Sequence, residues 1–324
     1  MNKLITNKKI YLNDYISDIN YSKYDFVFDA LYSRRIFFEK SKKIKDKQSK
    51  MDKIDNLLRV YNTSNNSFEK YISYKDTPCD PDSYSKLLQE IYNKLWGDLF
   101  YGKNFMKPYK KNIFCSDTLT SAQRRINDQL NSLKKDITIN ALNKDVIYSQ
   151  KQIIDSYKQN DDFRNFVNND SKLESLREFL SVYHTLGNYC PVPNGFNVAR
   201  SGSYADKDYV DLMLIKIKEY YDSKDINQSI NNAYKTLIEL LNHKDIFNCK
   251  LWLDCFDGWK DFVDKNFFKG NFVNDKYEVE LLCNKGNRNW KNHHIPDNEY
   301  DIFYRNTTEK IKKRTETIIK ALTK

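Results

Sequence analysis

The side chains best suited to binding or catalysis gather around one loop that is rich in turn residues. The stretch YHTLGNYCPVPNGFNVARSG, residues 183–202, holds three of the eight glycines and two of the six prolines of the chain. Polar groups of this kind, placed on a shaped loop, are typical of sites for anions or phosphates. They are His184, Asn188, Asn197, Arg200 and, just after the loop, Asp211.

Asp211 falls among apolar residues, where an unpaired carboxylate is costly. We therefore expect it to pair with Arg200 or with His184. Either pair would fix the loop between two helices. The arrangement is either a structural clamp or a binding site, and the sequence leaves both interpretations open.

Ser116 and Asp117 form a second candidate site. They could supply a nucleophile and an acid, but no histidine lies near them in the sequence. Both residue types also cap the N-termini of helices, and we favour that role.

The remaining polar motifs do not combine into a metal or cofactor site. Four aspartates recur at helical spacing, which fits the solvent face of a helix better than a cation site. They are Asp254, Asp257, Asp261 and Asp264. His293 and His294 supply too few ligands for a transition metal. The chain has no Cys-x-x-Cys pair, P-loop, Gly-rich dinucleotide turn or G-x-S-x-G motif, so we expect no metal and no cofactor.

Helical periodicity dominates the chain and should position these residues. Residues 80–97 fit a core helix with Asp80 as its cap and Gly97 at its end. Residues 116–135 fit a second amphipathic helix.

Two further helices should enclose the turn-rich loop. In the first, Ser171 and Glu174 form a capping box, and Gly187 ends the helix in a left-handed conformation. The second begins near Tyr209 and is apolar almost all round for two turns, which is typical of a buried helix.

These patterns predict a mainly α protein, a single globular helical unit with a small β element near 276–283. That element, KYEVELLC, alternates apolar and polar residues and is the clearest strand in the sequence. An N-terminal segment, residues 1–55, carries a lysine-rich stretch, and the main helical domain spans residues 56–324.

The chain is basic, with 54 Lys and Arg against 44 Asp and Glu and a formal charge of +10. Such an excess favours polyanions, nucleic acid above all, as partners. An AT-rich genome also enriches lysine without any selection for binding. The lysine-heavy residues 40–53 are open to two interpretations, a solvated segment or a nucleic-acid patch.

The six cysteines are scattered along the chain. The sequence has no apolar core of secretory length behind its basic start and no apolar run of about 20 residues. We expect a soluble cytoplasmic protein with reduced thiols and no membrane partner. The sequence indicates no oligomeric state.

The order of short motifs resembles that of a known family. The motifs are DPDSYSKLLQEIYNKLW, FCSDTLT, YHTLGNYCPVP with FNVAR, DYVDLMLIKIKEYY, FDGWKDFVD and IKKRTETI. This order is similar to that of uncharacterised bacterial cytoplasmic proteins classed only as a domain of unknown function. The resemblance implies no reaction. The positions that match its pattern are Asp80, Asp82, Trp96, Ser116, Asp117, Thr185, Gly187, Asn197, Arg200, Asp211, Tyr220 and Tyr221.

A fainter likeness is to the back half of His-Me-finger nuclease domains in restriction enzymes that attack modified phage DNA. TLGNYCPVPNGFN and the later EKIKKRTETI carry it. In those enzymes a histidine motif precedes the Gly-Asn segment, whereas here the His-Ile-Pro motif at 294–296 follows it. Catalysis by that mechanism would lack its general base.

The leading hypothesis is therefore a protein that binds nucleic acid or another polyanion, in a phage-defence or mobile-element setting. The first alternative is a non-catalytic protein-interaction module. The second is a degenerate or unusual nuclease-like enzyme centred on the residues of the loop.

Overall fold

The computed structural model shows a mainly helical chain. It describes residues 21, 23–64, 67–75, 81–101, 114–120, 122–133, 149–193, 196, 209–225, 230–241, 246–283 and 295–324. The first described helices are α2 (Phe26–Lys40), α3 (Lys47–Thr63), α4 (Ser67–Lys75), α5 (Pro81–Tyr84), α6 (Lys86–Tyr101) and α7 (Ala122–Leu133). They are followed by α8 (Gln150–Gln159), α9 (Asp161–Asn169), α10 (Glu174–Val182), α12 (Val210–Asp225), α13 (Ile230–Leu241), α14 (Ile246–Leu253), α15 (Trp259–Lys265) and α16 (Tyr300–Leu322). Short 3₁₀ turns are η2 (Ser171–Leu173), η3 (Leu186–Asn188) and η5 (Asp297–Glu299). The predicted mainly α, single-unit fold is confirmed.

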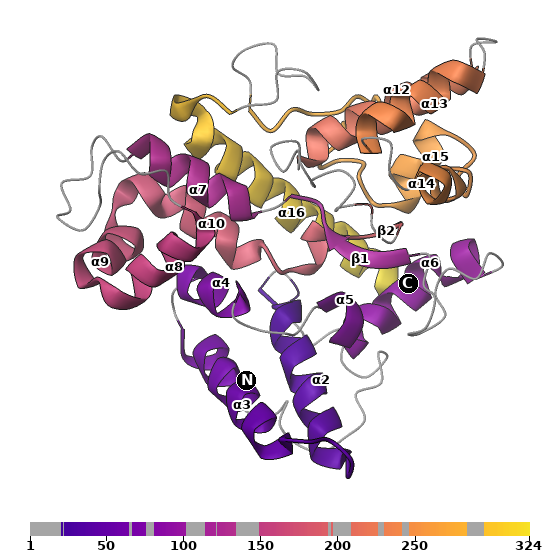
Figure 1. Cartoon of the computed structure of the whole chain (residues 1–324). Coiled ribbons are helices and arrows are strands. Elements are labelled where there is room, and N and C mark those ends of the chain that lie inside the picture. Colours follow the sequence, from indigo (N-terminus) through magenta and orange to yellow (C-terminus); the bar gives the residue numbers. More distant parts are fainter. Residues whose placement is uncertain are drawn as a thin grey trace.

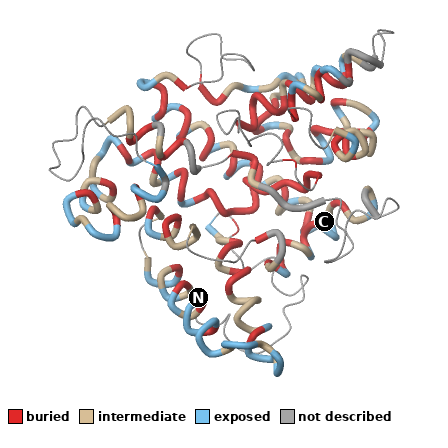
Figure 2. Tube along the Cα trace, in the orientation of Figure 1, coloured by how far each residue is buried: buried red, intermediate tan, exposed pale blue. Residues whose placement is uncertain are grey.

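Helix α16 crosses the middle of the molecule, where it is drawn in yellow in Figure 1. Its buried residues recur every three or four positions, so one stripe of the helix faces the core along its length. Phe303, Tyr304, Ile311 and Ile318 on this stripe are fully buried. Helix α10 and the turn η3 pack against α16. Buried residues gather at the centre of the trace and exposed ones at its margins (Figure 2).

Two short strands form an antiparallel pair, β1 (Phe114–Thr118) and β2 (Tyr189–Pro193). Ser116 lies opposite Pro191, and Asp117 lies opposite Cys190. The predicted helix over 116–135 therefore begins only at α7. Pairing with a strand distant in the sequence determines the conformation of these residues, and their local capping preference does not.

The β element near 276–283 is smaller than a strand. It contributes one isolated antiparallel bridge, between Val273 and Val279. Tyr277 has a φ of +64°, which interrupts the extended conformation that the alternating pattern predicts.

Three predicted helix ends differ from those in the structure. Helix α6 continues through Gly97, which lies in its interior. Asp170 rather than Ser171 caps η2, because its carboxylate accepts a hydrogen bond from the amide of Lys172 at 2.8 Å. Gly187 lies within η3 and has no positive φ. Close packing against α16, rather than a left-handed helix end, accounts for a glycine at that position.

Helices α2 and α3 form a hairpin at the lower end of the molecule in Figure 1. The hairpin has a small apolar cluster of its own, made of Val27, Ala30, Leu31, Phe38, Met51, Ile54, Leu57 and Tyr61. It is tied to the larger body where the amide of Phe26 donates to the carbonyl of His184 at 3.0 Å. The division into 1–55 and 56–324 stays a prediction, and position 55 lies inside α3.

Candidate functional site

His184 lies in a buried cluster of rings between α10 and η3. Its side chain is 4% exposed, and its ring centroid is 4.6 Å from those of both Tyr74 and Tyr183. Nδ1 is 3.3 Å from Oδ2 of Asp25, whose carboxylate also accepts two backbone hydrogen bonds at the start of α2. Nε2 has no hydrogen-bond partner among the described residues. The predicted pair of His184 with Asp211 is therefore not formed.

Lys75 adds a positive charge to this cluster. Its Nζ is 5.2 Å from the ring centroid of Tyr71 and 4.9 Å from that of Tyr74. Burial disfavours the charged amine and lowers its pKa from 10.5 to about 8. Within the described part of the chain no carboxylate pairs with Lys75, so the two aromatic faces are what stabilises its charge there.

Replacing Lys75 with methionine is expected to change how stability depends on pH. Between pH 8 and 10.5 the wild-type amine is largely neutral in the folded protein and charged in the unfolded chain. The unfolded state then binds more protons, so this group makes the free energy of unfolding rise with pH across that window. Relative to Lys75→Met, the free energy of unfolding of the wild type should increase by about 1–3 kcal/mol from the lower to the upper pH. Urea denaturation across this range measures the difference, and parallel profiles for the two proteins would contradict it.

Asn188 joins the turn η3 to the residues that follow β1. Its Nδ2 donates to the carbonyl of Tyr183 at 2.9 Å and to that of Thr120 at 3.4 Å, and its Oδ1 accepts from the amide of Thr120 at 3.3 Å. Its own carbonyl accepts from the amide of Leu119 at 2.7 Å. These contacts give Asn188 a structural role.

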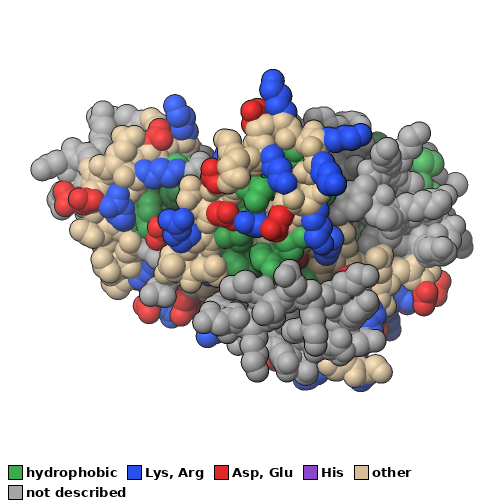
Figure 3. All heavy atoms as spheres, turned by 90° about the horizontal axis from the view of Figure 1, so that it is seen from below, with side chains coloured by type: hydrophobic (Ala, Val, Ile, Leu, Met, Phe, Trp, Pro, Cys, Tyr) green, Lys and Arg blue, Asp and Glu red, His purple; other side chains and the backbone are tan. Residues whose placement is uncertain are grey.

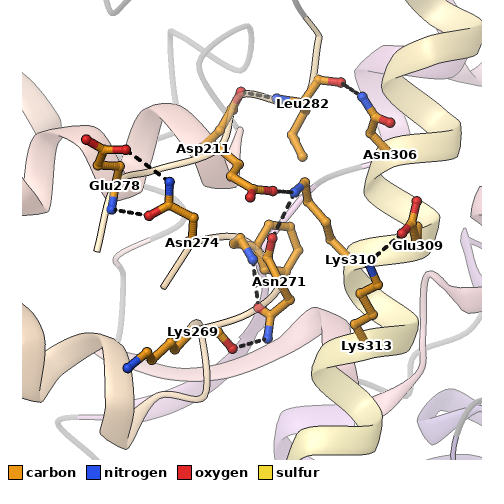
Figure 4. A network of polar contacts seen from close by, with 12 residues as sticks. Asp211, Lys269, Asn271, Asn274, Glu278, Leu282, Asn306, Glu309, Lys310 and Lys313 are labelled. Carbon is orange, nitrogen blue, oxygen red and sulfur yellow. Dashed lines mark hydrogen bonds and ion pairs between the residues drawn. The ribbon is translucent and has the colours of Figure 1, made fainter. Parts of the chain in front are cut away.

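Asp211 lies in the first turn of α12 and is fully buried. One carboxylate oxygen accepts from the amide of Leu212 at 2.9 Å, and the other accepts from the amide of Leu282 at 3.0 Å (Figure 4). The carbonyl of Leu282 in turn accepts from Nδ2 of Asn306 on α16 at 2.9 Å. A carboxylate in the first turn is also favoured by the helix dipole. These contacts fit the structural clamp, with backbone amides among the partners of Asp211.

The other predicted site residues are described in part or not at all. Ser116 and Asp117 lie within β1, so neither caps a helix, and only their backbone is described. Asn197 and Arg200 lie outside the described residues. A contact between Arg200 and Asp211 therefore stays a prediction.

Arg314 on α16 is a buried cation that the sequence analysis did not single out. Its guanidinium donates to the carbonyls of Gly187, Tyr189 and Asn266 over 2.7 to 3.1 Å. Burial lowers the pKa of the guanidinium. The bonds join α16 to η3, to β2 and to the end of α15. The signal that could have revealed this residue is its place on the apolar stripe of α16.

The four regularly spaced aspartates do not share one helix. Asp254 and Asp257 lie in the turn between α14 and α15, and Asp254 pairs with Lys250. Among the residues with described positions, no group of three His, Cys, Asp or Glu side chains could hold a metal ion. His293 and His294 lie outside those positions.

A cluster of exposed lysines surrounds the turn from α2 into α3, and we call it the lysine tip. It consists of Lys40, Lys42, Lys43, Lys45, Lys50 and Lys53. No described residue forms an ion pair with any of them. Residues 39–53 contain seven lysines and three acidic residues. Figure 3 views the molecule from below, the end where the hairpin lies, and shows Lys and Arg side chains among acidic and apolar ones.

Two acidic side chains of the hairpin pair with an arginine. Glu39 and Asp55 each accept a hydrogen bond from Arg35 at 2.9 Å. Asp52 accepts from the side chain of Gln48 at 2.8 Å. Asp46 and Asp52 form no ion pair with a described residue, and the excess of lysines over acids leaves residues 39–53 with a net positive charge.

Phe37 adds an exposed ring to this end of the hairpin. It lies in the last turn of α2, shortly before the lysine tip, and is 61% exposed. An exposed aromatic ring beside cations is a feature of surfaces that bind single-stranded nucleic acids.

Fold and site together define a helical protein in which a basic hairpin joins a larger helical body. The chain belongs to a family of unknown function (DUF6994), whose model matches residues 65–318. This confirms the family indicated by the order of the motifs, while the fainter nuclease likeness stays a prediction. The lysine tip precedes the matched residues. No curated protein and no solved structure matches the chain.

No helix in the described ranges combines the length and the hydrophobicity that a membrane span needs.

Proposed function

We propose that the protein binds single-stranded nucleic acid through the lysine tip. The observation that carries this proposal is the set of six exposed lysines without an ion-pair partner among the described residues. Each phosphate that a lysine neutralises releases a condensed counterion, so a cluster of this kind favours a polyanion.

Phe37 favours a single strand over a duplex. Its exposed ring can stack on an unpaired base, and such stacking accepts any base because each has a π-face. In a duplex those faces are covered by neighbouring base pairs. A single strand therefore uses both the charge and the ring of the hairpin.

The two other functions considered from the sequence have less support. Asn188 is committed to backbone groups and the side chain of His184 is only 4% exposed, which weakens a catalytic site at the loop. A protein-interaction module with an acidic protein partner would use the same lysine tip. The binding experiment below distinguishes that function from nucleic-acid binding. The phage-defence or mobile-element setting stays a prediction.

Neutralising part of the lysine tip is expected to weaken binding. The variant Lys42→Gln/Lys43→Gln/Lys45→Gln should bind a ten-nucleotide thymidylate strand at least about tenfold more weakly at moderate ionic strength, because it loses three phosphate contacts. Fluorescence anisotropy of a labelled strand measures the affinity.

The matched control removes the same charge elsewhere. Lys276, Lys312 and Lys320 are exposed on the larger body and form no ion pair with a described residue. Their triple glutamine variant should keep wild-type affinity. Equal losses in the two variants, or no binding by the wild type, would overturn the proposal and favour a protein partner.

A further inference from the structure

We infer that a pocket beside the lysine tip holds the base and phosphate of one nucleotide of the bound strand. This inference rests on the proposed function and adds a site to it. The pocket lies between α3, α4 and the junction of α8 with α9, and its volume is about 620 Å³. Pockets for small ligands measure about 300–1,000 Å³, so a nucleotide fits by size.

The inner wall of the pocket is apolar. Leu57 and Val60 come from α3, Ile72 comes from α4 and Tyr157 comes from α8. The hydroxyl of Tyr157 donates to Asn168 at 3.1 Å, which fixes the ring in the wall. Such a wall suits the flat apolar faces of a nucleobase.

Cations border the pocket on more than one side. Lys53 comes from α3, Lys158 from α8 and Arg164 from α9. The guanidinium of Arg164 is held in place, because it donates to two backbone carbonyls at 2.9 and 3.0 Å and to the carboxylate of Asp161 at 2.6 Å. Among the described lining residues Glu69 is the one acid. With Arg164 paired to Asp161, Lys53 and Lys158 against Glu69 still leave the lining with a positive charge, which favours a ligand that joins an apolar part to a negative charge.

Lys53 belongs to both the lysine tip and the rim of the pocket. It is exposed and forms no ion pair with a described residue. Lys50, Lys53 and Asn56 follow one another at intervals of three along α3, so they lie on neighbouring positions of one helix face. A strand whose phosphates bind the lysine tip can therefore continue along α3 to the pocket. This continuity favours a nucleotide within a strand over an unrelated anion.

The walls of the pocket come from both sides of the family boundary. Helix α3 precedes residue 65, whereas α4, α8 and α9 lie within the matched residues 65–318. The hairpin and the family domain therefore contribute to one site. The hairpin would recognise nucleic acid through this shared pocket as well as through its charge.

The test compares two strands of ten residues with equal numbers of phosphates, one of thymidylate and one without bases. Wild-type protein should bind the thymidylate strand at least about tenfold more tightly by fluorescence anisotropy. Asn56→Trp fills the pocket from an exposed position of α3 and should lower the affinity for thymidylate toward that for the abasic strand, leaving only the part of the preference that Phe37 supplies. The matched control is Asn62→Trp, an exposed position on the same helix outside the pocket lining, which should keep the tenfold preference.

A second variant, Ser73→Phe on α4, fills the pocket from another helix, so the test does not depend on Asn56→Trp folding correctly. Circular dichroism checks that both variants are folded. Equal wild-type affinity for the two strands would overturn the pocket and leave the lysine tip as the binding surface. A tenfold preference that survives in both folded pocket variants would place the base elsewhere, at Phe37 for example, and would also overturn the inference. Failure of the wild type to bind either strand would overturn the proposed function along with it.

Discussion

Replacing Gly187 with alanine should destabilise the protein by at least about 3 kcal/mol. A Cβ at this position would overlap the carbonyl oxygen of Ile311 and lie 2.9 Å from its carbonyl carbon. Both atoms belong to the backbone of α16, so a change of rotamer cannot relieve the overlap. The amide of Gly187 also donates to Oγ1 of Thr315 at 2.9 Å, and a shift of η3 would weaken this bond. Urea denaturation measures the loss.

The matched control for this substitution is Gly97→Ala in α6. No atom lies within 4 Å of a Cβ there, other than the neighbours and helix backbone that any helical residue has. Alanine is favoured over glycine in a helix interior, so this variant should be more stable than the wild type by about 0.5–1 kcal/mol. A Gly187→Ala protein as stable as the wild type would show that η3 and α16 do not approach as closely as described.

Removing the guanidinium of Arg314 should have an effect of similar size. Arg314→Met keeps a long apolar side chain but leaves the carbonyls of Gly187, Tyr189 and Asn266 without this donor in the core. Because buried acceptors would lose a charged donor, the free energy of unfolding should fall by about 3–5 kcal/mol. Denaturation by urea at neutral pH measures it.

Arg305→Met is the control on the same helix. Arg305 is 66% exposed and pairs with Asp301 at 3.1 Å, an arrangement that contributes at most about 1 kcal/mol. If Arg314→Met cost no more than Arg305→Met, the guanidinium would not be what joins α16 to η3 and β2.

Periodicity predicted the elements whose burial depends on local sequence. The apolar stripe of α10 and the apolar first turns of α12 are buried as expected. The mainly helical fold follows from such patterns because each helix satisfies its own backbone hydrogen bonds. The same reasoning applied to α16 would have revealed Arg314, which follows Ile311 by three positions and precedes Ile318 by four.

Contacts between distant segments account for what the sequence could not predict. The partner of His184 is Asp25, 159 positions away, and no local pattern relates the two. The pairing of β1 with β2 likewise overrides the capping preference of Ser116. The left-handed helix end predicted at Gly187 is wrong, because the need for glycine there comes from close packing against α16, which lies far along the chain.

The lysine-rich stretch shows a different limit of sequence reasoning. Its composition is more typical of a solvated segment than of a binding surface. The difference lies in the neighbouring acids, because Glu39 and Asp55 pair with Arg35 rather than with the lysines. Only the folded hairpin makes that distinction visible.

The salt dependence of binding tests the central claim most directly. The measured quantity is the slope of the logarithm of the binding constant for the thymidylate strand against the logarithm of the salt concentration. Each phosphate contact to a single strand contributes about 0.7 to this slope, so Lys42→Gln/Lys43→Gln/Lys45→Gln should reduce its magnitude by about 2. The triple glutamine variant at 276, 312 and 320 should leave it unchanged. Equal slopes for the wild type and the lysine-tip variant would contradict the claim that the lysine tip binds the phosphates.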